Sequence, residues 1–111
     1  MPEVNSQEII NSAATLVESY AAGKRHFSKA ELGNADLQGI NLKGSDFSYA
    51  DLSEANLSRA NLRGTDLSFA DLGQANLMDA DLRGALLMSA NLRQADLKGT
   101  NLEKADYDYL R

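Results

Sequence analysis

Residues 50–69 read ADLSE ANLSR ANLRG TDLSF, four units of five residues that share one pattern. The third residue of each unit is Leu, the first is Ala or Thr, and the second is Asp or Asn. The pattern extends in both directions to cover sixteen consecutive units, from Ala30 to Tyr109. Phe47 and Tyr107 replace Leu at the third position, and only Glu31 and Leu86 depart from Asp or Asn at the second. Chance does not produce such a run, so we expect a repeat architecture.

A spacing of five residues fits neither the helix period of 3.6 nor the strand period of 2. No continuous helix or strand keeps Leu52, Leu57 and Leu62 on one face, so the chain must bend within every unit. A coil in which each unit forms one short side directs the large third residue and the small first residue inward. A narrow lumen then holds one Leu and one Ala per side, and the polar second, fourth and fifth positions face outward.

The unit A(D/N)LXX resembles the signature of the pentapeptide-repeat family, and the resemblance covers residues 30–109. It implies an all-β solenoid, a right-handed quadrilateral β-helix with four units per coil and about four coils. The side chains favour four sides independently, because Lys43, Arg63 and Arg83 recur every 20 residues and each precedes a glycine. Coils stacked at the strand spacing of roughly 4.8 Å predict a solenoid about 20 Å tall.

The segment before the repeat is typical of an amphipathic helix over residues 5–22. Asn5 and Glu8 resemble a capping box, and Gly23 is placed to stop the helix. We expect this helix to cover the N-terminal end of the solenoid, since an open end exposes core and backbone edge. The predicted organisation is one structural domain, with a capping helix and junction at 1–26 and the β-helix at 27–111. The apolar face of the helix comprises Ile9, Ile10, Ala13, Leu16, Val17 and Tyr20.

Composition limits the chemistry open to this chain of 111 residues. It has no cysteine, and its single histidine, His26, has no catalytic motif around it. We therefore predict that the protein is not an enzyme and has no catalytic, cofactor or metal site. The repeated Asp and Asn residues are assigned to turn hydrogen bonds and solubility, because all four sides carry them. With no leader sequence and no run of 18 apolar residues, we expect a cytoplasmic protein without a membrane partner.

The charge balance bears on the kind of partner. Against 16 Asp and Glu there are 11 Lys and Arg, and the net charge of −5 opposes direct binding of nucleic acid. The leading prediction is a non-enzymatic interaction module that presents columns of side chains to a protein partner. The family resemblance also implies an alternative, an acidic DNA mimic that inhibits or protects a DNA-handling enzyme such as gyrase. Basic residues interleaved with the acidic ones break a one-signed field and disfavour this alternative.

Two columns of outward side chains are candidate interaction surfaces, one aromatic and one basic. Ser89 interrupts the aromatic column, so stacking between coils is an equal alternative to binding. For the basic column, a solvated face is favoured over a site for an acidic partner. A homodimer through the C-terminal coil, at Tyr107, Tyr109 and Leu110, is also predicted, because no second cap follows the last unit. The candidate surface residues are Tyr49, Phe69, Tyr109, Lys43, Arg63 and Arg83.

Overall fold

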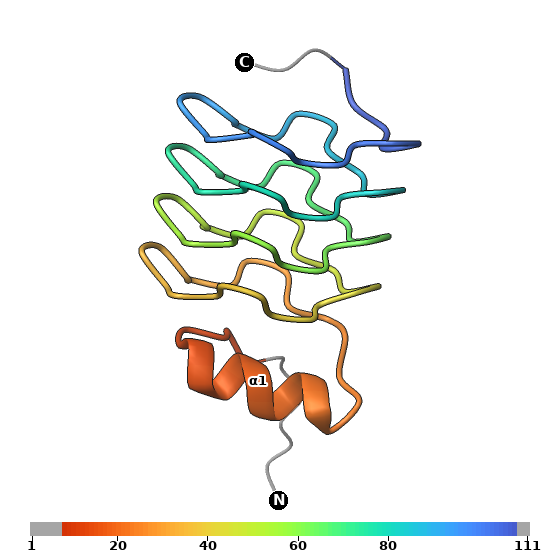
Figure 1. Cartoon of the computed structure of the whole chain (residues 1–111). Coiled ribbons are helices and arrows are strands. Elements are labelled where there is room, and N and C mark those ends of the chain that lie inside the picture. The colour runs from red at the N-terminus through yellow and green to blue at the C-terminus, as the bar shows by residue number, and fades with distance from the viewer. Residues whose placement is uncertain (1–7, 109–111) are drawn as a thin grey trace, which may run out of the picture.

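The computed structural model describes residues 8–108 as a β-helical solenoid preceded by one helix, α1, at Ala13–Ala21 (Figure 1). Within this range the coils pair through isolated parallel bridges, one residue per side, rather than through extended strands. Every bridge joins residues 20 apart, as His26 to Asp46 and Asp46 to Asp66. Since a unit has five residues, a coil of 20 residues has four sides. The principal-axis extents, 48 × 25 × 22 Å, agree with a prism of nearly square cross-section.

The bridge register assigns every unit to one of four sides. We call them sides A to D in chain order, and in each coil the chain passes from one side to the next around a corner. Side A consists of 25–29, 45–49, 65–69, 85–89 and 105–108, and side B of 30–34, 50–54, 70–74 and 90–94. Side C consists of 35–39, 55–59, 75–79 and 95–99, and side D of 40–44, 60–64, 80–84 and 100–104.

The chain turns at the fifth residue of every unit, where φ lies between 59° and 75° from Lys29 to Lys104. The turn is closed across the corner: the N–H of Ala50 donates to the carbonyl of Phe47 at 3.0 Å. Glycine adopts this left-handed conformation without a steric cost, which explains why it recurs at the fifth position. At Gly44 a Cβ atom would meet nothing within 4 Å, so conformation rather than crowding favours glycine there.

Backbone hydrogen bonds fix each coil to the next. On side D, for example, the Leu62 N–H donates to the Asp81 carbonyl at 2.8 Å, and the Asp81 N–H donates to the Ala60 carbonyl at 2.9 Å. The corner adds a third bond, from the Gly64 N–H to the Arg83 carbonyl at 3.0 Å. Corresponding bonds recur on the other sides, so the exterior columns are held in register by the backbone itself.

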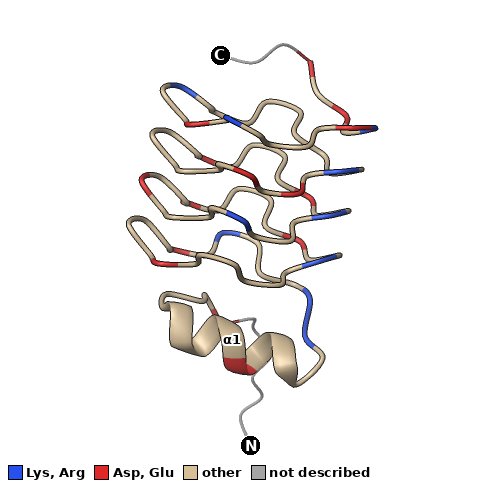
Figure 2. Ribbon diagram, in the orientation of Figure 1, with Lys and Arg blue, Asp and Glu red and all other residues tan. Residues whose placement is uncertain are grey.

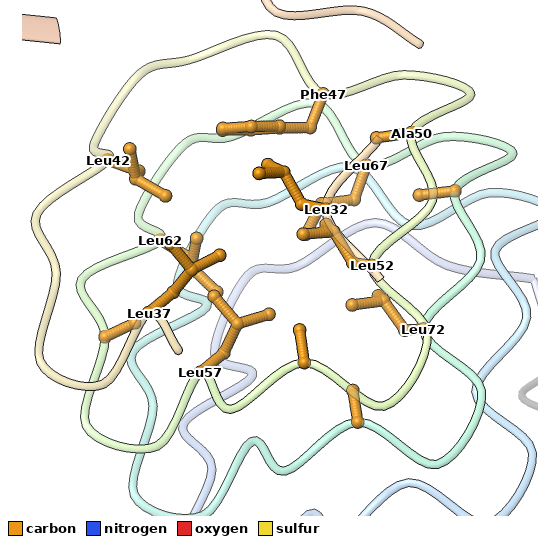
Figure 3. Packing of buried hydrophobic residues seen from close by; sticks show 14 of the residues in the cluster. Leu32, Leu37, Leu42, Phe47, Ala50, Leu52, Leu57, Leu62, Leu67 and Leu72 are labelled. Atoms are coloured by element: carbon orange, nitrogen blue, oxygen red, sulfur yellow. The ribbon is translucent and has the colours of Figure 1, made fainter. Parts of the chain in front are cut away.

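The lumen is filled by the third and first residues of the units, whose side chains point into the space enclosed by the coils (Figure 3). Third-position residues from Phe27 to Leu92 are all buried, and Ala, Ser or Thr at most first positions packs between them. Each fully buried Leu contributes about 2 kcal/mol. The C-terminal end of the stack is less well covered, since Leu97 and Leu102 are only partly buried.

The start of α1 differs from the sequence prediction. Ser12 is the N-cap, and its side-chain oxygen accepts a hydrogen bond from the Thr15 N–H at 3.1 Å. The predicted capping box is therefore wrong: Glu8 is exposed and precedes the helix, while Asn5 lies outside the described residues. Residues 8–11 are not helical, and this leaves the Ile10 carbonyl free to accept the Glu31 N–H of the first coil at 2.7 Å.

The face of α1 that meets the solenoid is narrower than predicted. Within α1, Leu16 is fully buried, Ala13 and Tyr20 are partly buried against the core, and Val17 is exposed. In the segment before the helix, Ile10 is buried and Ile9 is exposed. The Tyr20 hydroxyl donates to the carbonyl of Lys43 at 2.8 Å and so satisfies one backbone group of the first coil. Figure 1 shows α1 lying across the end of the stack.

The junction between α1 and the first coil is held by Arg25. Its guanidinium donates to the carbonyls of Tyr20 at 3.0 Å and Lys24 at 2.8 Å, and it lies 3.6 Å from the centre of the Tyr20 ring. A cation is favourable at a helix C-terminus, where carbonyl groups lack partners. Gly23 follows the helix with φ of 96°, in the position predicted for the helix stop. No helix in the described part of the chain is long and apolar enough to span a bilayer.

Leu62→Asp tests the dry lumen. Leu62 is 1% exposed, and a carboxylate there has no charged partner, so we expect a loss of at least about 4 kcal/mol of unfolding free energy. Urea unfolding followed by circular dichroism measures the loss. The control is Arg59→Asp at an exposed corner, for which we expect a change within about 0.5 kcal/mol. A Leu62→Asp protein as stable as the control would contradict the packing described above.

Candidate functional site

Two of the predicted aromatic residues form a stacked pair on the surface. The rings of Tyr49 and Phe69 have centroids 4.9 Å apart and an interplanar angle of 2°. We call Tyr49 and Phe69 the ring pair; their side chains are 58% and 53% exposed. The third predicted member, Tyr109, lies outside the described residues. Ser89 occupies the same corner one coil after Phe69. The stacking between coils that the sequence offered as an alternative to binding is therefore present. About half of each of the two residues is still exposed to solvent.

The ring pair stands at backbone positions that suit glycine better. Tyr49 has φ of 63° and Phe69 of 62°, a region that bulky residues rarely adopt. The left-handed conformation costs roughly 1–2 kcal/mol per residue. A stacked aromatic pair stabilises the fold by only about 0.5–1.5 kcal/mol in addition to the contribution of its buried area. Eleven of the sixteen corners from Lys29 to Lys104 have a residue other than glycine in this conformation, so the ring pair differs from the others in its exposed apolar area rather than in its backbone.

Sequence reasoning missed two further members of this surface, Leu86 and Met88, which are 41% and 39% exposed. The Leu86 bridge to Asp66 and the bond from the Phe69 N–H to the Met88 carbonyl, 3.0 Å, place both residues one coil beyond Phe69 on side A. We call Tyr49, Phe69, Leu86 and Met88 the apolar patch. The signal was available in the sequence, because Leu86 breaks the rule for second positions.

The exposed apolar residues of the solenoid are confined to one side. Besides the apolar patch, the described coils have one other large apolar side chain with high exposure, Tyr107, which is also on side A. Sides B, C and D have no such residue within the described part of the chain. A contiguous apolar surface is more informative than single exposed residues, because it marks contact sites in soluble proteins.

Asp and Asn at second positions hold the turns. The Oδ1 atom of Asp66 accepts a hydrogen bond from the N–H of Ser68, two residues later, at 3.0 Å. Thirteen units, this one included, form the same bond between the second and fourth residues. At Asp51, hydrogen bonds from the Ser53 hydroxyl and the Ser53 N–H lower the pKa of the carboxyl group. Leu86 has no acceptor to offer, and the Met88 N–H has no partner among residues 8–108.

The predicted basic residues do form a column on side D. The Gly44 N–H donates to the Arg63 carbonyl at 2.9 Å, and the Gly64 N–H donates to the Arg83 carbonyl at 3.0 Å, so Lys43, Arg63 and Arg83 lie one above another. Figure 2 shows blue segments stacked near one corner of successive coils. The backbone thus brings these three residues together as the 20-residue spacing predicts.

Acidic neighbours reduce the positive charge of this column at its C-terminal end. The Arg83 guanidinium donates to both carboxylate oxygens of Asp81, with Nη2 2.6 Å from Oδ2 and Nε 2.9 Å from Oδ1. This bond raises the pKa of Arg83 and lowers the pKa of Asp81. In the next coil the column position is Glu103. Within this column, only Lys43 and Arg63 are exposed cations that form no ion pair among the described residues.

His26 lies at the edge of a cleft of about 650 Å³ between the N-terminal segment and the first coil. Ser19 and Glu8 line the same cleft, but no hydrogen bond joins either of them to His26 in the described structure. His26 is itself part of the coil, since it bridges to Asp46. The residues around the cleft therefore form no nucleophile and base pair as they stand.

Comparisons with known proteins identify relatives of the chain. The family model described as Pentapeptide repeats (8 copies) matches residues 26–64 and 65–103. A search of curated proteins gives no match.

Three solved structures are similar to this one. A pentapeptide repeat protein from Nostoc PCC 7120, alr5209, is 66% identical with a TM-score of 0.92, over 95% of this chain and 90% of that chain. HetL, from Nostoc sp. strain PCC 7120, is 38% identical with a TM-score of 0.74, over 85% of this chain and 46% of HetL. Rfr23, a pentapeptide repeat protein from Cyanothece 51142, is 30% identical with a TM-score of 0.61, over 90% and 82% of the two chains.

Leu86→Asn should stabilise the protein. The new amide oxygen can accept the Met88 N–H as Asp66 accepts the Ser68 N–H, which contributes about 0.5–1.5 kcal/mol. The reverse change, Asp66→Leu, should destabilise by a similar amount. Urea unfolding measures both, with Leu86→Ala as the control that removes the apolar side chain without adding an acceptor. Equal stability of the Asn and Ala variants would show that the missing turn bond costs nothing.

Proposed function

The chain belongs to the pentapeptide-repeat family, whose members are right-handed quadrilateral β-helices, and from this premise we propose that it is a non-enzymatic module that binds a protein partner. Proteins of this family are generally structural or interaction modules. The observation that carries the proposal is the apolar patch, four large apolar side chains exposed on side A of the solenoid.

Rigidity makes the patch suitable for binding. The N–H groups of Tyr49 and Phe69 both donate to carbonyls of the next coil at 3.0 Å, so the backbone that carries the ring pair is fixed, and the two rings stack on each other. Binding then requires little ordering of the protein, and the loss of conformational entropy that weakens many complexes is small. Aromatic residues and Met are also enriched at the centres of protein interfaces.

The relatives support a role in interaction without naming a partner. HetL is described as involved in heterocyst differentiation regulation, and this chain is 38% identical to it over 46% of its length. We take from HetL only that a protein of this fold has a regulatory role, and propose no pathway.

The alternative predicted from the sequence, an acidic DNA mimic acting on an enzyme such as gyrase, has less support from the charges. A mimic of duplex DNA needs an acidic surface of one sign. On side D the column of Lys43, Arg63 and Arg83 interrupts such a surface (Figure 2). A supercoiling assay with purified protein separates the two functions, because only the mimic inhibits gyrase at micromolar concentration.

Capture from native cell extract tests the proposed module. The immobilised full chain should retain a specific protein, and Tyr49→Ser with Phe69→Ser should reduce its retention by about tenfold or more. The matched control is Arg59→Ser with Asp79→Ser, a pair at the same corner positions on side C, with φ of 59° and 60°. We expect the control to bind as the wild type does. If the wild-type chain retains no protein, the proposed function is wrong.

The C-terminal end of the stack is proposed to join two copies of the chain. Leu97 and Leu102 are partly buried there and Tyr107 is exposed, while the N–H groups of Leu97 and Leu102 have no partner within residues 8–108. Unpaired edges of this kind favour association. The other predicted contact residues, Tyr109 and Leu110, lie outside the described residues. The N-terminal end differs, because α1 lies against it and we propose that α1 acts as its cap.

Light scattering at high concentration tests the self-association. We expect the mass of a dimer for the wild type and of a monomer for Tyr107→Asp, since a charge at the exposed edge opposes apolar contact. Val17→Asp, on the exposed face of α1, is the control and should remain dimeric. A monomeric wild type would contradict this proposal.

A further inference from the structure

Carboxylates flank the ring pair on both sides. The ring pair occupies the corner between sides A and B, so it lies between two columns of second-position residues. Asp46 and Asp66 precede it on side A, and Asp51 and Asp71 follow it on side B. An exposed apolar strip between two acidic columns is complementary to a partner that carries both apolar and positive groups.

These carboxylates are not neutralised within the described structure. The only ion pair among residues 8–108 is the one between Arg83 and Asp81 on side D. Asp46 and Asp51 accept hydrogen bonds from the serines that follow them, and these donors carry no charge. At Asp51 the serine bonds lower the pKa, so the carboxyl group is ionised at neutral pH.

A depression of about 430 Å³ lies on side B. The residues that line it are Ser53, Glu54, Asp71, Gly73, Gln74, Asn91, Arg93 and Gln94. Gly73 contributes no side chain, and Glu54 and Asp71 place two carboxylates at its surface. Arg93 and Asn91 stand beside these carboxylates, and the Asn91 amide donates to Asp71 at 3.0 Å, so the attraction of the surface for a cation rests on the acidic columns rather than on this depression.

We infer that the apolar patch docks a basic amphipathic segment of a partner protein. Leu86, Met88 and the ring pair contact its aliphatic or aromatic side chains, and its Arg or Lys side chains reach the acidic columns. Arginine suits this surface best, because its planar guanidinium stacks on aromatic rings and binds carboxylates with two hydrogen bonds. The net charge of −5 also attracts a basic segment from a distance. This inference rests on the proposed function and specifies the chemistry of the partner.

A second copy of the chain is a poorer occupant. Among its cations without an ion pair, Lys43 and Arg63 are stacked in successive coils on side D, whereas Lys29, Arg59, Arg93, Lys98 and Lys104 each stand singly in another column. The outward positions that neighbour Lys43 and Arg63 are Asn41, Asn61 and glycine, and side D has no exposed apolar residue within the described coils. Such a surface supplies charge to the acidic columns but nothing that covers the ring pair.

Selection of peptides tests the inference. Random short peptides displayed on phage are selected on the immobilised full chain, and the peptide that binds best is synthesised with a fluorophore for anisotropy measurements. We expect selected peptides to be positively charged and to contain aromatic or aliphatic residues. Phe69→Ser should weaken binding of the labelled peptide by about tenfold or more. Leu86→Asn should also weaken it, although the same change stabilises the fold.

Charge is tested by a matched pair of variants. Asp51→Asn with Asp71→Asn removes two charges beside the ring pair and keeps both turn acceptors. Asp36→Asn with Asp96→Asn removes two charges from the same positions on side C. We expect the first pair to weaken peptide binding by about tenfold and the second by less than about twofold, with weaker binding at high salt.

Several outcomes overturn the inference. These are neutral or acidic selected peptides, no enrichment of any peptide, full binding by Phe69→Ser, or equal effects of the two charge pairs. If the chain captures a protein from extract but fails these peptide tests, the inference is wrong and the proposed function stands. If neither experiment shows binding, both are wrong.

Discussion

The lumen of the solenoid has room for one large and one small side chain per side, and this constraint determines the rest of the structure. It makes Leu and Ala recur every five residues and requires the backbone to turn after each unit. Each turn requires a positive φ at the fifth residue of the unit and favours a hydrogen-bond acceptor at the second residue of the unit. Most positions of a unit are therefore already specified by the fold.

The outward positions of a unit differ in how many residue types they accept. Fourth positions carry no backbone requirement, so Lys43, Arg63 or Met88 fits there equally well. Fifth positions accept any residue at the cost of a left-handed conformation, and second positions accept a residue without an acceptor at the cost of a turn bond. Leu86 is the departure that reduces stability, because it gives up a turn bond that thirteen other units make, whereas Phe69 shares its left-handed conformation with ten other corners that are not glycine.

The sequence predicted the solenoid well because its period is a direct consequence of packing. The inward Leu residues and the column of Lys43, Arg63 and Arg83 follow from counting residues. The start of α1 could not be decided this way, since Asn5 and Ser12 are both good N-caps and only contact with the first coil distinguishes them. Pairing of Arg83 with Asp81 depends on side-chain conformation, which the repeat does not specify.

The distribution of exposed apolar residues gives the strongest reason to assign a function to side A. If such residues were neutral substitutions, they would be spread over four equivalent sides, yet in the described coils all of them lie on side A. Stacking accounts for Tyr49 beside Phe69, but it does not account for Leu86, whose neighbour in the same column is Asp66. The one lost turn bond, at Leu86, thus lies on the same side as the exposed ring pair and one coil beyond Phe69. Selection for binding explains this coincidence, because a partner that covers the surface supplies the burial that the fold itself does not.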